Sequence, residues 1–124
     1  MQLNIIHEAL AANSEITDAV SDRIFAVYVP ENTQAPYIVL TMVDNQGEPT
    51  KDGAAVDRCM IEVRIWHERD NYAGLTDIAS KCRMVLERLQ DDASVIYYER
   101  EMDHYDEEQQ LIGLIQDYKI LIQK

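Results

Sequence analysis

The chain has 124 residues, of which 47% are hydrophobic and 27% charged, and its formal net charge at pH 7 is −12. This balance predicts one folded domain over residues 1–124, burying roughly two thirds of its unfolded surface. The charge excludes a reader of nucleic-acid sequence, which needs a basic face, and it disfavours anionic membranes. Residues 1–10 lack the features of a signal peptide, and no apolar run reaches the ~20 residues of a membrane helix. We therefore expect a protein made in the cytosol.

Two short helices are predicted at the start of the chain. Over residues 3–12, apolar side chains recur at helical spacing. Ser14 stands where it can cap a second helical turn. The apolar side of the two helices consists of Leu3, Ile6, Leu10, Ile16 and Val20.

The segment from Asp22 to Val43 predicts two extended stretches joined by a linker. Residues 24–29 are strand-like, and Pro30 and Pro36 bracket the polar residues between the two stretches. Neither proline can donate to a sheet ladder, and each favours extended geometry in the residue before it. The run Tyr37–Val43 is aromatic and β-branched, as is typical of a buried strand.

Residues 44–57 are expected to form a loop or hairpin tip, because Gly47, Pro49 and Gly53 stand among polar residues. The length exceeds the usual hairpin connection, and long loops are often functional. We predict an assembly element in this loop that contacts partner proteins. Its residues are Gly47, Glu48, Pro49, Lys51, Asp52 and Gly53.

The clearest strand runs from Asp57 to His67, with Cys59, Ile61, Val63 and Ile65 alternating with a mixed set of residues. This pattern is typical of a half-buried antiparallel strand. Trp66 belongs to the mixed face. It either covers a neighbouring strand or lies partly exposed at a contact with another subunit, and the first arrangement is the more common.

A long helix follows, capped by Asp70 or Asn71. Its apolar residues recur at spacings of three and four, so the helix should lie across the apolar face of the sheet. This stripe consists of Leu75, Ile78, Ala79, Cys82, Val85, Leu86 and Leu89.

Two more strands are predicted over residues 95–105 and 111–122. Their apolar phases comprise Ile96, Tyr98 and Met102 in the first, and Ile112, Leu114, Tyr118, Ile120 and Ile122 in the second. Alternation in the first strand predicts that Glu99, Glu101 and Asp103 lie on one sheet face, and Asp106-Glu107-Glu108 should make the turn. Such an acidic surface has three interpretations: a solvated face, a surface past which DNA slides, or a mimic of DNA charge.

These elements predict an α+β fold. A single-domain antiparallel sheet of about four to five strands should carry the long helix on one face, beside a short N-terminal helix. No catalytic, cofactor-binding or metal residue is predicted. His7, His67 and His104 fall in separate elements, Cys59 and Cys82 follow apolar phases, and no glycine-rich loop or nucleophile elbow occurs.

The order of motifs resembles the tail-completion (tail-terminator, head-tail joining) proteins of long-tailed bacteriophages and prophages. The resemblance rests on a leading helix, Arg23-Ile24-Phe25, Pro30, Ala35-Pro36-Tyr37-Ile38-Val39, and the strand ending at Trp66-His67 before an amphipathic helix and two strands. It covers most of the chain. It does not explain the acidic residues 99–108.

The resemblance implies a structural virion protein of the tail, assembled in the bacterial host cytoplasm and without enzymatic activity or cofactor. Such proteins form a ring, commonly a hexamer, that caps the tail-tube protein and docks the head-connector protein, and purified subunits can be monomers. Two alternatives remain from the residues: an acidic binding module of the DNA-mimic type, and a small α+β enzyme whose site is unrecognised. Neither specific nucleic-acid binding nor membrane binding is expected.

Overall fold

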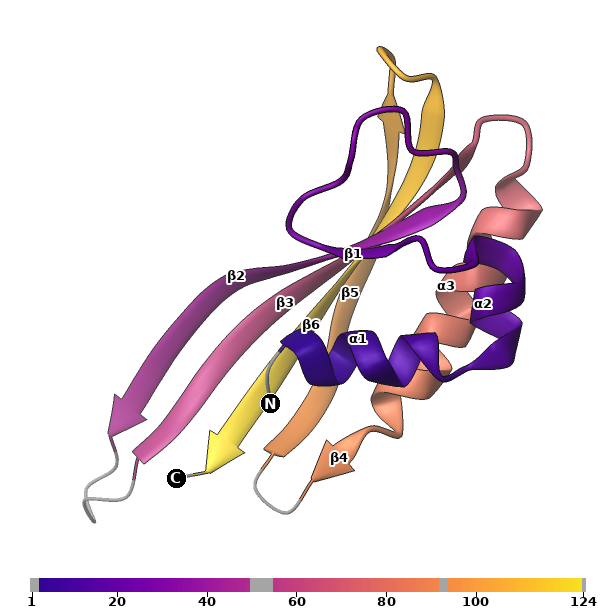
Figure 1. Cartoon of the computed structure of the whole chain (residues 1–124). Helices are drawn as coiled ribbons and strands as arrows, with labels where there is room; N and C mark the ends of the chain where they lie inside the picture. The colour runs from indigo at the N-terminus through magenta and orange to yellow at the C-terminus, as the bar shows by residue number, and fades with distance from the viewer. Residues whose placement is uncertain (1–2, 50–54, 92–93, 124) are drawn as a thin grey trace.

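A computed structural model describes residues 3–49, 55–91 and 94–123, which form three helices and a mixed sheet (Figure 1). The helices are α1 (Leu3–Ala11), α2 (Ser14–Val20) and α3 (Tyr72–Glu87). The strands are β1 (Ile24–Ala26), β2 (Tyr37–Pro49), β3 (Ala55–Glu68), β4 (Gln90–Asp91), β5 (Ser94–Asp106) and β6 (Leu111–Gln123). In the described residues the strand order is β1-β2-β3-β6-β5-β4.

The α+β fold predicted from the sequence is confirmed. The four long strands pair antiparallel, as expected. The three-residue β1 instead pairs parallel with β2, with Ile24 opposite Ile38. The extended stretch predicted at residues 24–29 is therefore shorter than expected, because the chain leaves the sheet after Ala26 to enter the linker.

The main core lies between the helices and one face of the sheet. All three helices cover this same face (Figure 1). The predicted stripe packs against the Cys59, Ile61, Val63 and Ile65 side of β3 in one cluster. The members of the stripe are buried except Val85 and Leu89, which are partly buried, and Leu89 follows the end of α3. Ile6 and Leu10 of α1 and Ile16 and Val20 of α2 complete this cluster. Matched helix and strand periodicities thus produced the two layers.

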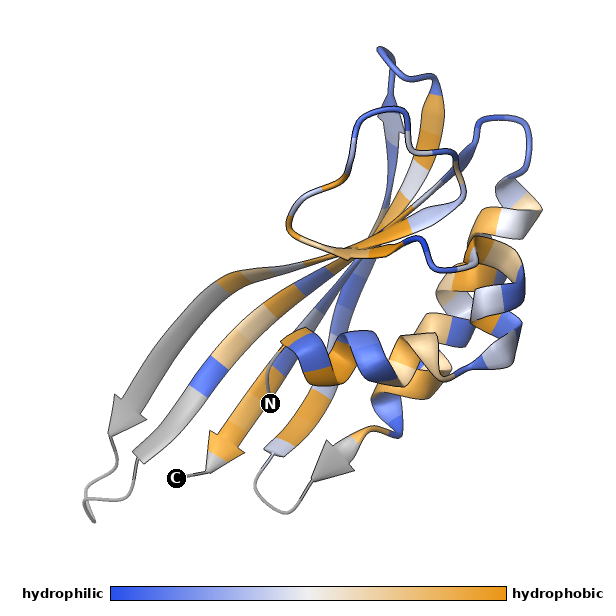
Figure 2. Ribbon diagram, viewed as in Figure 1, coloured by the Kyte–Doolittle hydropathy of each residue, from blue (hydrophilic) through white to orange (hydrophobic). Residues whose placement is uncertain are grey.

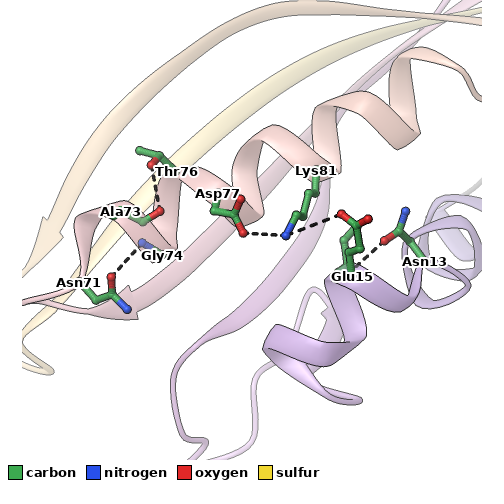
Figure 3. A network of polar contacts seen from close by, with 9 residues as sticks. Asn13, Glu15, Asn71, Ala73, Gly74, Thr76, Asp77 and Lys81 are labelled. Carbon is green, nitrogen blue, oxygen red and sulfur yellow. Dashed lines mark hydrogen bonds and ion pairs between the residues drawn. The ribbon is translucent and has the colours of Figure 1, made fainter.

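Asparagine side chains cap two of the helices, as Figure 3 shows. Asn71 Oδ1 accepts a hydrogen bond from the Gly74 amide at 2.9 Å, which confirms the predicted capping region of α3. The cap of α2 is Asn13, whose Oδ1 accepts from the Ile16 amide, and not Ser14, which is the first helical residue. Lys81 of α3 pairs with Asp77 of the same helix at 2.7 Å and joins α3 to α2 through Glu15 at 3.7 Å.

A second, smaller apolar cluster lies on the opposite face of the sheet. Tyr37, Val39 and Trp66 are buried there, and residues of the linker contribute to the cover. A Cβ atom added at Gly113, which stands opposite Trp66 on β6, would lie 2.7 Å from the indole ring. Trp66 therefore covers a neighbouring strand, the first of its two predicted arrangements.

The loop predicted at residues 44–57 is largely a β-hairpin. The backbone of Asp44–Pro49 continues β2, and residues 55–57 belong to β3, with Gly47 opposite Asp57 and Pro49 opposite Ala55. Proline is compatible with this position because, within the described part of the chain, no strand pairs with the outer edge of β2 here. Lys51, Asp52 and Gly53 lie outside the described residues.

A β-bulge in β5 corrects the predicted placement of the carboxylates. Tyr98 stands opposite Tyr118 and Arg100 opposite Asp117, so Glu99 is an extra residue. The extra residue reverses the alternation. Glu99 consequently contacts Lys119 on the face away from the helices, whereas Glu101 and Asp103 lie on the helix-facing side. The prediction that these three carboxylates share one face is wrong.

Candidate assembly surfaces

The β2–β3 hairpin, which we call the arm, reaches the end of the sheet that lies past the helix layer, where β6 and β5 also reach (Figure 1). On the β2 side, β1 pairs only with Ile38–Leu40. Among the described residues, no strand pairs with the outer edge of β2 from Thr41 to Pro49. Gly47, Glu48 and Pro49 therefore lie on an open backbone edge of the arm, and such an edge can bind another chain.

The opposite end of the sheet is strongly acidic. The β5–β6 turn, the turn after β3 and the β1–β2 linker lie at this end, and Figure 2 shows both turns in hydrophilic colours. We call it the acidic end. It carries seven carboxylates and one base: Glu31, Glu68, Asp70, Asp103, Asp106, Glu107, Glu108 and Arg69.

The predicted acidic residues therefore divide into two groups. Asp106, Glu107 and Glu108 are together at the tip, where Asp106 Oδ1 accepts hydrogen bonds from the Glu108 and Gln109 amides at 3.0 and 3.2 Å. Asp103 belongs with them and accepts from the Tyr72 hydroxyl at 3.1 Å. Glu99 and Glu101 lie nearer the middle of β5.

The outer sheet face away from the acidic end is not a continuous field of negative charge. Glu99 pairs with Lys119 at 3.6 Å, and Arg100 Nε donates to Asp117 at 2.6 Å. Arg64 Nε donates to Glu62 on the same face. A mimic of duplex DNA needs regularly spaced, unneutralised carboxylates, so this pairing argues against the DNA-mimic alternative.

The linker exposes two apolar side chains that sequence reasoning missed. Val27 and Tyr28 are 68% and 70% exposed. Val27 has φ of 68°, and the Tyr28 amide donates to the Ala26 carbonyl in a tight γ-turn. A β-branched residue at positive φ is strained, and such strain is concentrated at functional segments. The linker is therefore a further candidate contact surface.

A buried hydrogen-bond network centred on Gln116 of β6 links α3, β5 and β6. Gln116 is fully buried, and its Nε2 donates to the Ala79 carbonyl at 2.9 Å and to Glu101 at 3.1 Å. Its Oε1 accepts from the Tyr118 hydroxyl at 2.7 Å. Burial raises the pKa of Tyr118 well above its ordinary value, so this hydroxyl stays protonated and remains a donor.

The histidines and cysteines stand in structural surroundings. The His7 ring contacts the Ile24 carbonyl at 2.8 Å, His67 Nδ1 accepts from the Glu68 amide, and His104 packs edge-on against Trp66. Cys59 and Cys82 are buried in the core. Within the described ranges, no group of three or more His, Cys, Asp or Glu side chains could hold a metal ion. No helix among these residues is long and apolar enough to cross a membrane.

Comparison with known proteins places this fold. Residues 5–123 match the family model described as tail completion protein gp17. A chain of the solved structure "Virion of native gene transfer agent (GTA) particle" is similar in fold, with a TM-score of 0.81 at 12% identity, over 96% of this chain and 92% of that chain. No curated protein matches. The chain belongs to the tail completion protein gp17 family and is a structural protein of a bacteriophage-type virion, in whose tail it is located.

Proposed function

We propose that this protein, acting as one domain over residues 1–124, caps the tail tube and provides the surface on which the head connector docks. The family match over residues 5–123 is the observation that carries this proposal. The role needs stable surfaces and no chemistry, so the protein is proposed to be non-enzymatic. The proposed partners are the tail-tube protein, the head-connector protein and further copies of this chain in a ring, commonly of six.

Two features of the fold support such a role. The β2–β3 arm has an open edge at one end of the sheet, and the acidic end lies at the other end of the same strands. A subunit with contact surfaces at both ends can join one protein above and another below. We propose that the arm, with Gly47, Glu48, Pro49, Lys51, Asp52 and Gly53, contacts one neighbour in the virion.

The acidic end is proposed as the second docking surface. Its charge is concentrated at the tip, in Asp103, Asp106, Glu107 and Glu108, while Glu99 on the outer face is paired. Concentrated charge steers a basic partner and sets its register more than it adds affinity. A solvated face and a surface that repels passing DNA remain the competing interpretations of this charge.

The gene's removal tests the function. A phage or prophage with an early stop codon in this gene should produce filled heads and separate tails, with irregular tail lengths by electron microscopy. Expression of the intact chain from a plasmid should restore joined particles. Normal yields of infectious particles from the stop-codon strain, without the plasmid, would contradict the proposal.

A further inference from the structure

A pocket of about 650 Å³ opens beside the acidic end, between the β1–β2 linker and the β5–β6 turn. Tyr37 of β2, Trp66 of β3 and Leu111 of β6 supply apolar and aromatic walls. Glu31 of the linker and Asp106 of β5 supply carboxylates. Three separate segments of the chain, at residues 29–37, 66 and 106–111, thus place two negative charges beside two aromatic rings.

The carboxylate of Asp106 is held in a defined position. Its Oδ1 accepts hydrogen bonds from the Glu108 and Gln109 amides, which fix the side chain at the rim of the pocket. Burial, and then the negative charge of Asp106, raise the pKa of Tyr37, which is consistent with the Asp106 carboxylate lying near the Tyr37 side chain. Among the described residues, no lysine or arginine forms an ion pair with Asp106 or Glu31.

This combination selects for one kind of side chain. An anion would be repelled, and a purely apolar group would leave the carboxylates desolvated without a partner. A guanidinium group stacks on aromatic rings and donates in a planar fork to carboxylates. Its five donors also suit the amide and hydroxyl acceptors of Asn32, Gln109 and Thr33, which line the same pocket. An ammonium group offers neither stacking nor the fork.

We propose that this pocket receives an arginine side chain from a partner protein in the virion. The proposal rests on the proposed function, because it takes the partner to be the protein that docks at the acidic end. The aromatic walls hold the guanidinium plane, Asp106 and Glu31 neutralise its charge, and the flanking backbone of the partner lies along the linker, where Val27 and Tyr28 are exposed.

A direct test uses Trp66, the single tryptophan of the chain, as the reporter. N-acetyl-L-arginine methylamide is titrated into the purified protein while tryptophan fluorescence is recorded. We expect a saturable change with a Kd on the order of millimolar, as for one small side chain bound alone. The neutral citrulline analogue should produce no saturable change at the same concentrations, and the lysine analogue should bind several-fold more weakly.

Paired variants separate the pocket from general acidity. Asp106→Asn with Glu31→Gln removes two charges that line the pocket, and Asn retains the oxygen that caps the turn. The matched control, Glu107→Gln with Glu108→Gln, removes two charges from the adjacent turn outside the pocket. The pocket variant should weaken arginine binding by about tenfold or more, because it loses charge-assisted hydrogen bonds. The control should change Kd less than about twofold, as expected for exposed, screened charges.

Particle assembly then tests whether a partner protein in the virion uses this pocket. In the complemented stop-codon strain, the pocket variant should lower the yield of joined particles well below that of the control variant. Equal yields from the two variants would contradict the claim that a virion partner occupies the pocket. In the titration, a citrulline response equal to that of arginine would overturn the arginine site itself. Loss of self-association in the pocket variant would overturn the assignment to a different protein and place a second copy there. The proposed function fails separately, when the stop-codon strain itself makes normal particles.

Discussion

At the scale of the residue, Gln116 shows how a polar side chain is accommodated in an apolar strand. It interrupts the alternation of Leu114, Tyr118 and Ile120 on the helix-facing side of β6, yet it is completely buried. Three hydrogen bonds satisfy its amide, one of them from the Tyr118 hydroxyl. Sequence periodicity marks the position as inward-facing but does not reveal these partners, because they come from α3, β5 and β6.

Replacement of Gln116 should therefore cost more than loss of one hydrogen bond. Gln116→Leu leaves the buried Tyr118 hydroxyl without its acceptor and should lower the free energy of unfolding by about 1–3 kcal/mol. Adding Tyr118→Phe removes the orphaned hydroxyl, so the double variant should be less destabilised than the sum of the single variants. Urea unfolding of the four proteins measures this. Strict additivity would show that the two side chains are energetically independent.

Cys82 provides a pH dependence that follows from burial. Burial raises the pKa of this thiol to about 12 from an ordinary value of 9.0. Above about pH 9 the unfolded chain loses this proton while the folded chain keeps it, so the free energy of unfolding falls as pH rises towards 12. Cys82→Ala should flatten the decline between pH 8.5 and 10.5, in urea titrations at ~0.5-unit steps. An unchanged slope would indicate that the thiol ionises in the folded protein.

At the scale of the element, β3, β6 and α3 were predictable from the spacing of apolar residues, because each of them has a buried face along much of its length. The predictions that were wrong or incomplete concern features that leave no periodic pattern in the sequence. The bulge at Glu99 adds one residue to a strand whose polar and apolar residues still alternate locally, so the reversal of faces is invisible in the sequence. The parallel pairing of β1 involves only three residues, too few for a periodic signal. Glycine and proline in residues 44–57 mark a turn but do not show how far the strands extend.

Deletion of Glu99 tests the bulge. Without the extra residue, Tyr98 and Arg100 become consecutive while keeping their opposite partners, so every other side chain of β5 stays on its face. We expect a cost of only about 1 kcal/mol or less, since the exposed Glu99–Lys119 pair contributes little. Deletion of Met102 is the matched control, because it moves Asp103 and Tyr105 to the wrong face or shifts the register. Thermal unfolding followed by circular dichroism should show a much larger loss for the control; equal losses would argue against the bulge.

Shortening the β2–β3 arm should separate folding from assembly. Deletion of residues 48–53 joins Gly47 to Ala54 and leaves a short connection back to Asp57. Among the residues whose burial is described, the first core side chain on β3 is Cys59, outside the deletion, so we expect the melting temperature to change by only a few degrees. The same deletion should abolish head–tail joining in the complemented strain. A folded variant that gives a normal particle yield would exclude the arm as an assembly element.

At the scale of the whole molecule, one face of the sheet carries the helices, and the proposed contact surfaces lie at its two ends. The sequence indicated the hairpin at residues 44–57 and the acidic turn, because both appear as runs of polar residues. It did not indicate the pocket beside the acidic end, since residues 29–37, Trp66 and residues 106–111 converge there only in the folded chain. The likeness to a virion chain at 12% identity shows that a very different sequence can adopt this fold.

The proposed role of this protein in joining tails to heads can be measured in vitro with separated parts. Tails and filled heads are purified separately from the stop-codon strain, mixed, and supplied with the purified chain. Infectious particles should appear in proportion to the added protein until the tail ends are saturated, and the protein should be effective only when incubated with tails before heads are added. Efficient joining without the protein, or no joining at any concentration of the folded protein, would contradict the proposed role in head–tail joining.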